Sequence, residues 1–143
     1  MVTNRHILKF SLLLLLLLII AALLPLLVTN KETVKVRYAV QFTLDNELSS
    51  VWSAGDHLID GVGKEPIGTV ETVLVTPALS ENANGIFPLP DKSRVLLTVV
   101  CDGARAGNAL SVGGITLLTG KRLSLHGKGV AYGVCLWAEE VTE

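Results

Sequence analysis

Apolar and polar residues alternate along much of the chain after residue 31, with the period of two that is typical of β-strands. The clearest example is TVKVRYAVQFTL, residues 33–44, in which one face is entirely apolar and the other is largely polar. The apolar face comprises Val34, Val36, Tyr38, Val40, Phe42 and Leu44. A second segment, SRVLLTVVCD at residues 93–102, is apolar at most positions, which predicts a central strand buried on both faces.

Shorter strand-like segments separated by turn residues fill the rest of this region. Examples are DHLID, IGTVETVLVT and several stretches within residues 108–140 that are broken by Gly-Gly, Thr-Gly and HGKG. One helical turn is expected after Asp45 or Asn46, whose side chains are suited to capping a helix. Pro77 is expected to end a strand and residues 78–92 to form a long loop. The pattern predicts an all-β domain, a small barrel or sandwich of about seven or eight short strands.

The chain begins with a different pattern, a run of 19 residues without a charge from Phe10 to Val28. A helix of that length covers roughly 28 Å, which is close to the thickness of a bilayer's hydrocarbon core. The alternative is a cleaved signal peptide, but the apolar part of such peptides is usually about 7–15 residues long and precedes a small-x-small cleavage site. Here the run is longer and continues as LLVTNKE. We therefore expect a retained transmembrane helix at residues 10–28.

Charge on either side of this run predicts its orientation. Arg5 and Lys9 precede it, and basic residues close to a span favour the cytoplasmic side. We therefore expect a cytoplasmic tail at residues 1–9, a single pass through the cell membrane, and an extracytoplasmic β-domain at residues 32–143.

The composition of the region after the span excludes one class of partner and leaves one structural question open. This region has 10 Lys and Arg against 13 Asp and Glu, a net charge of −3, so it has no basic surface suited to nucleic acid. Its two cysteines, Cys101 and Cys135, either form a disulfide outside the cytoplasm or act as small buried apolar residues.

Candidate catalytic and metal-binding residues do not form a recognisable motif. His57 and His126 lie in or beside turns without a second ligand at metal-binding spacing, and on a strand Asp56 and Asp60 would face away from His57. GVGKEP lacks the spacing of a phosphate-binding loop. We therefore expect no catalytic, cofactor-binding or metal-binding residues, and a protein that is not an enzyme.

The segment ENANGIFPLPDK is less typical of a solvated loop, because it places Ile86, Phe87, Pro88 and Leu89 between polar flanks. Either this loop folds back over one end of the core, or it is a contact surface for a partner or a membrane.

Several segments carry a resemblance to a known family. The short basic tail and single span, followed by VRYAVQF, AGDHLIDGVGKEPIGTVETV, VLLTVVCDG and VGGITLLTGKRLSLHGKGVAYGVCLW, resemble the bacterial membrane-protein family known as domain of unknown function 4330. The segment AGDHLIDGVGKEPIGTVETV is also similar to the opening of mammalian-cell-entry (MCE) domains, which are membrane-anchored barrels of lipid transporters. The first resemblance implies a bacterial envelope protein and assigns no catalytic residues.

Two functions follow as expectations. The first is a structural, scaffolding or assembly component of the envelope, bound to the bilayer through its helix and to an envelope protein or to further copies of itself. The second is an MCE-like module of a lipid or polymer transport complex, in which GIFPLP and VGGITLLTG would face a common axis.

Overall fold

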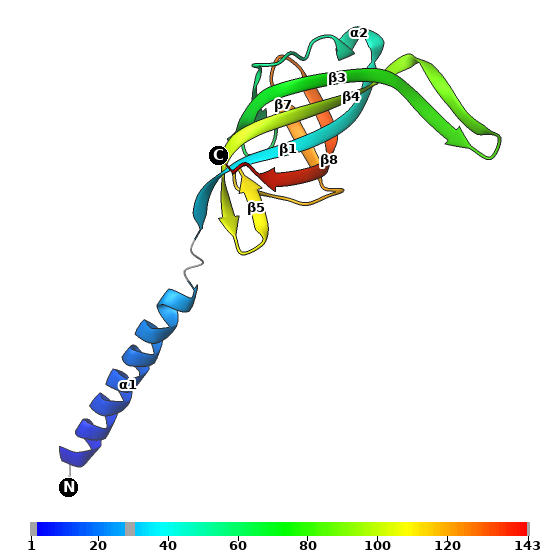
Figure 1. Ribbon diagram of the computed structural model, residues 1–143. Helices are drawn as coiled ribbons and strands as arrows, with labels where there is room; N and C mark the ends of the chain where they lie inside the picture. Colours follow the sequence, from blue (N-terminus) through cyan, green and yellow to red (C-terminus); the bar gives the residue numbers. More distant parts are fainter. Residues whose placement is uncertain (1–2, 28–30, 143) are drawn as a thin grey trace. The chain divides into compact units, whose positions relative to one another are not determined.

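The computed structural model describes residues 3–27 and 31–142 and divides into two units, Met1–Lys31 and Glu32–Glu143 (Figure 1). The first unit contains the helix α1 (Thr3–Leu27). The second contains β1 (Glu32–Asp45), α2 (Asn46–Ser49), β2 (His57–Asp60), β3 (Pro66–Asn82), β4 (Gly85–Ala106), β5 (Ala109–Val112), β6 (Ile115–Leu117), β7 (Arg122–His126) and β8 (Val130–Glu140). The expected helical turn after Asp45 is α2.

The large apolar side chains of α1 that the structure describes, between Leu8 and Leu24, are 48–70% exposed. In the described parts of the chain, however, no helix has both the length and the apolar character needed to cross a membrane. The transmembrane helix predicted for residues 10–28 is therefore not supported by the structure. Its last residue, Val28, lies outside the described residues.

The prediction of an all-β domain is confirmed, because the described strands form one antiparallel sheet of eight. β1 pairs with β8 along one edge and with β4 along the other, so the strands β1-β8-β7-β2-β3-β4 form a closed ring. The hairpin of β5 and β6 continues the sheet from the end of β4. Of the two architectures left open by the sequence, this closure is that of a small barrel.

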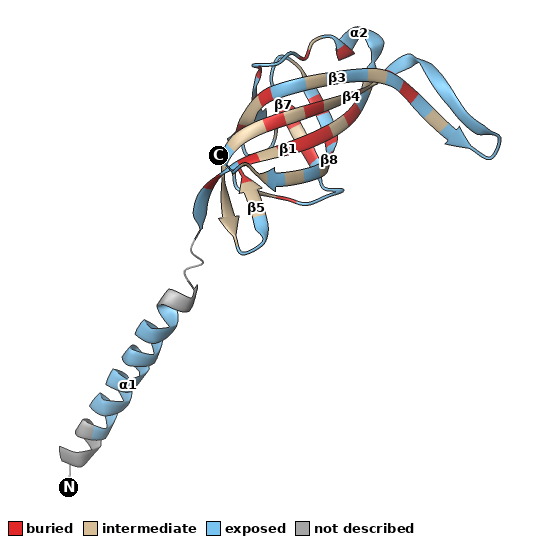
Figure 2. Ribbon diagram, in the orientation of Figure 1, coloured by how far each residue is buried: buried red, intermediate tan, exposed pale blue. Residues whose placement is uncertain are grey.

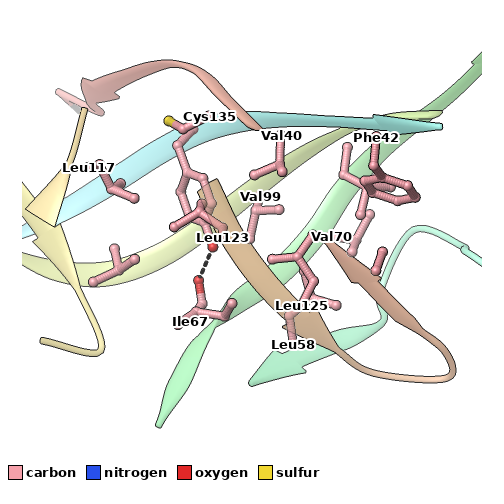
Figure 3. Close-up of a cluster of buried hydrophobic side chains, with 14 of the residues drawn as sticks. Val40, Phe42, Leu58, Ile67, Val70, Val99, Leu117, Leu123, Leu125 and Cys135 are labelled. Carbon is pink, nitrogen blue, oxygen red and sulfur yellow. Dashed lines mark hydrogen bonds between the residues drawn. The ribbon is translucent and has the colours of Figure 1, made fainter. Parts of the chain in front are cut away.

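Inward-facing side chains of the ring form a single core (Figures 2 and 3). The alternation predicted for β1 is confirmed, since Val36, Tyr38 and Val40 are fully buried. The core is narrow enough that the phenol of Tyr38 reaches across it and donates a hydrogen bond of 2.6 Å to the carbonyl of Ile67 on β3. The barrel is therefore filled by side chains at this level and leaves no channel there.

The strand β4 lies between β1 and β3, as expected for a central strand, but it is not buried on both faces. Val95, Leu97 and Val99 are fully buried, whereas Arg94, Leu96 and Thr98, which alternate with them, are partly exposed. The physical reason is the closure of the sheet, which gives each strand one interior face and one outer face.

The prediction of a long loop at residues 78–92 is wrong, because most of this segment is paired β-structure. β3 and β4 continue past the ring as a hairpin, residues 78–91, that extends away from the barrel and that we call the arm (Figure 1). Pro77 does not end β3, because the register of the hairpin shifts between Pro77 and Leu79 and the pairing then resumes. Proline is tolerated in such strands where no third strand requires its missing N–H.

Candidate functional site

The arm carries the four residues predicted as a contact surface. Ile86, Phe87 and Leu89 are 64%, 46% and 38% exposed, and the arm extends away from the barrel, so these side chains do not cover the end of the core (Figure 2). This position favours a contact surface over a lid. The contact itself stays a prediction.

Register divides the arm into two faces of different chemistry. Leu79 lies opposite Pro88 and Glu81 lies opposite Ile86, and residues directly opposite or two apart on a strand share a face. We call these four residues the acidic face of the arm. Phe87 lies opposite Ser80 and belongs to the other face. The predicted cluster is therefore split between two faces. The sequence analysis did not indicate this split, because a loop has no alternating faces.

Hydrogen bonds hold the arm at both of its ends. At the base, the side-chain amide of Asn46 donates to the carbonyl of Pro90 at 2.9 Å, and its oxygen accepts from the hydroxyl of Ser93 at 2.6 Å. At the tip, the N–H of Asn84 donates to the side chain of Asn82 at 2.8 Å. The arm thus presents its exposed apolar residues on an ordered hairpin, which lowers the entropic cost of binding.

A second surface of interest is a groove bordered by the end of β2, the β5–β6 hairpin, β7 and β8. It has a volume of about 580 Å³. We call it the basic groove, and its lining comprises Asp60, Val62, Gly114, Ile115, Lys121, Arg122, Leu123, Ser124 and Tyr132. Val62 and Tyr132 are among the most exposed apolar side chains of the β-domain. Sequence reasoning missed this groove.

The charged residues of the basic groove differ in whether they have a partner within the chain. Lys121 and Arg122 take part in none of the ion pairs found among the described residues. Asp60 is buried, and its carboxylate accepts the N–H of Gly63, which holds the turn after β2. The groove therefore presents two free cations beside apolar side chains, in a domain whose net charge is negative.

A third groove, of about 560 Å³, brings together His57, Thr69, Cys101 and Asp102. His57 Nδ1 lies 3.0 Å from the hydroxyl of Thr69. Burial raises the pKa of the Cys101 thiol, and the neighbouring Asp102 raises it further. Cys101 is therefore a protonated thiol at neutral pH and lacks the activation that a cysteine nucleophile needs.

Asp56 and the other residues of possible catalytic or metal-binding type have structural contacts. Asp56 accepts the N–H of Ser53 at 2.8 Å and pairs with Lys128 at 2.7 Å, and the hydrogen bond from Lys128 lowers the pKa of this carboxyl. In the part of the chain that the structure describes, no group of three His, Cys, Asp or Glu side chains is placed to hold a metal ion. Every buried side-chain nitrogen or oxygen of those residues has a hydrogen-bond partner.

The two cysteines are free thiols in the structure. Cys101 lies opposite Val36 and Cys135 lies opposite Val40, on the two strands that flank β1. Two strand spacings and four residues along a strand separate their Cα atoms by roughly 16 Å. A disulfide requires less than about 7 Å, so bonding them would require the barrel to rearrange.

Comparison of the chain with protein-family models, curated proteins and solved structures finds no match. The resemblance to the 4330 family and to MCE domains therefore stays a prediction.

Proposed function

We propose that this protein is an assembly component of a bacterial envelope, in which a β-domain held at the cell membrane acts through protein contacts and not through catalysis. The observation that carries this proposal is the arm, an ordered hairpin that keeps Leu79, Ile86 and Phe87 in water. Exposed apolar surface of this kind is typical of an interaction site.

Catalysis is disfavoured by the chemistry of the grooves. The thiol of Cys101 is protonated, the carboxylates of Asp56 and Asp60 are engaged in holding turns, and His57 contacts a threonine. An active site would need a nucleophile and a base that converge on one reacting position.

Cross-linking in membranes tests the contact. A photoreactive benzophenone side chain at position 86, on the acidic face of the arm, should yield a discrete cross-linked protein product. The control is the same group at position 72, where Thr72 is exposed on the barrel wall. A yield at position 86 no higher than at position 72 would refute a role of the arm in assembly.

The membrane attachment in this proposal is supported by the uncharged run from Phe10 to Val28 and by the exposed apolar side chains of α1. Lipid would cover these side chains at a lower free energy than water.

The full chain should stay in the membrane pellet after alkaline carbonate extraction. Replacing Leu15 and Ile19 by Lys should release it, because a charged side chain is far less stable in lipid than in water. The matched Leu15→Ala and Ile19→Ala variant should stay in the pellet. Extraction of the native chain would refute the attachment.

A further inference from the structure

We propose that the acidic face of the arm of one copy docks into the basic groove of a second copy, so that the chain assembles head to tail. This inference rests on the proposed function, in which the arm makes a protein contact, and it identifies the partner.

The acidic face combines three apolar side chains with one free carboxylate. Leu79, Ile86 and Pro88 surround Glu81 on a single face of the hairpin. Glu81 takes part in none of the ion pairs formed by the described residues. A partner for this face needs an apolar surface with a cation beside it.

The basic groove has these properties. Val62, Ile115 and Tyr132 provide the apolar surface, and Lys121 and Arg122 provide unpaired cations. The carboxylate of Asp60 also lines the groove, so the lining carries a net charge of +1, opposite to that of the arm's face. The groove's volume of about 580 Å³ is similar to that of ligand-binding pockets in proteins, so it is large enough to hold several side chains of the arm.

The two surfaces cannot meet within one copy as the domain is folded. The arm leaves the barrel beyond β3 and β4, and it extends away from the β5–β6 hairpin that borders the groove (Figure 1). The contact must therefore join different copies. Because it joins unlike surfaces, every open assembly has one free arm at one end and one free groove at the other, so it either closes into a ring or grows into a filament.

Charge reversal of the full chain in detergent micelles tests this contact, with molar mass measured by light scattering after size-exclusion chromatography. The native chain should form oligomers. Glu81→Lys and Arg122→Glu should each weaken association at least about tenfold, since each places like charges in contact. The exposed Glu47 on α2 belongs to neither surface, and Glu47→Lys should associate as the native chain does.

Recombination of the two reversals distinguishes head-to-tail docking from a symmetric contact between arms. The double variant should assemble again, and so should an equimolar mixture of the two single variants, because each reversed arm then finds a reversed groove. Circular dichroism confirms that each variant is folded, and Lys121→Glu replaces Arg122→Glu if the latter fails to fold.

Three results would overturn the inference: a native chain that stays monomeric, oligomers that both reversals leave intact, or reversals that do not recombine. In the second case other surfaces, such as α1, hold the copies together. None of these results removes the proposed function, because cross-linking at position 86 to a different envelope protein would still support it. A closed ring would favour the transport module over a scaffold.

Discussion

Removing the phenolic oxygen of Tyr38 tests whether the barrel interior is organised as described. Tyr38 is fully buried, and its hydroxyl donates to the carbonyl of Ile67 at 2.6 Å across the core (Figure 3). Tyr38→Phe keeps the ring and its packing but removes this bond and leaves a buried carbonyl without that donor. A lost buried hydrogen bond costs about 1 kcal/mol, and an unsatisfied buried group costs about 1–3 kcal/mol. We expect the free energy of unfolding to fall by about 1–3 kcal/mol and, for a domain of this size, Tm to fall by about 4–13 °C.

The matched control is Tyr132→Phe, because Tyr132 lies on the outer side of β8 and is 76% exposed. Urea and thermal unfolding should show this variant within about 0.5 kcal/mol of the native protein. Equal stability of Tyr38→Phe and Tyr132→Phe would contradict the hydrogen bond and the depth of Tyr38 in the core.

A pH series adds a second readout on the same variant. Burial raises the pKa of the Tyr38 phenol well above its ordinary value. The unfolded chain then releases this proton first as the pH rises, so the stabilisation by Tyr38 is complete below about pH 10 and declines above it. The stability difference between the native protein and Tyr38→Phe should therefore narrow above about pH 10. A constant difference across this range would contradict the raised pKa.

Three further predictions concern the β-domain. Glu32–Glu143, expressed without α1, should fold and give a strand-type circular dichroism spectrum, because its core is built from its own strands; a disordered spectrum would refute this. Lys128→Met should lower the stability to urea at neutral pH, because it removes the ion pair with Asp56. The pKa of Asp56 is depressed in the folded state, so this loss of stability should disappear as the pH falls from above about 4 through the depressed pKa. An unchanged loss of stability in strong acid would count against the ion pair. Since Cys101 and Cys135 are free, dithiothreitol should leave Tm unchanged, and a lower Tm under reduction would reveal a disulfide.

The alternation of side chains determined the class of the fold and the content of its core. Val36, Tyr38 and Val40 could be assigned to the interior from the sequence, because a half-buried strand requires a period of two wherever one face meets a core. The same reasoning predicted opposite orientations for Asp56 and His57; Asp56 is indeed buried and His57 exposed, yet the turn brings both into the lining of one groove with His126.

Local composition was a poorer guide where pairing decided the structure. Pro77 and the polar residues around the arm's tip indicated a loop, yet two strand segments pair with each other there. The pairing tolerates the prolines because no third strand lies alongside that would need the N–H groups that proline lacks. The basic groove was missed for a related reason. Its only local signals are the adjacent Lys121 and Arg122, at the start of β7, and the outward position of Tyr132 on β8, which the folding of the chain brings together.

The uncharged apolar N-terminal run and the all-β domain with its alternating core follow from the order of residues along the chain. Three other features arise from the folding of the domain: the closure of the sheet by pairing of β1 with β4, the acidic face of the arm, and the groove with two unpaired cations. The physical reason is that register and closure are set by long-range strand pairing. That pairing depends on which segments meet in space, which the pattern within any one segment does not encode.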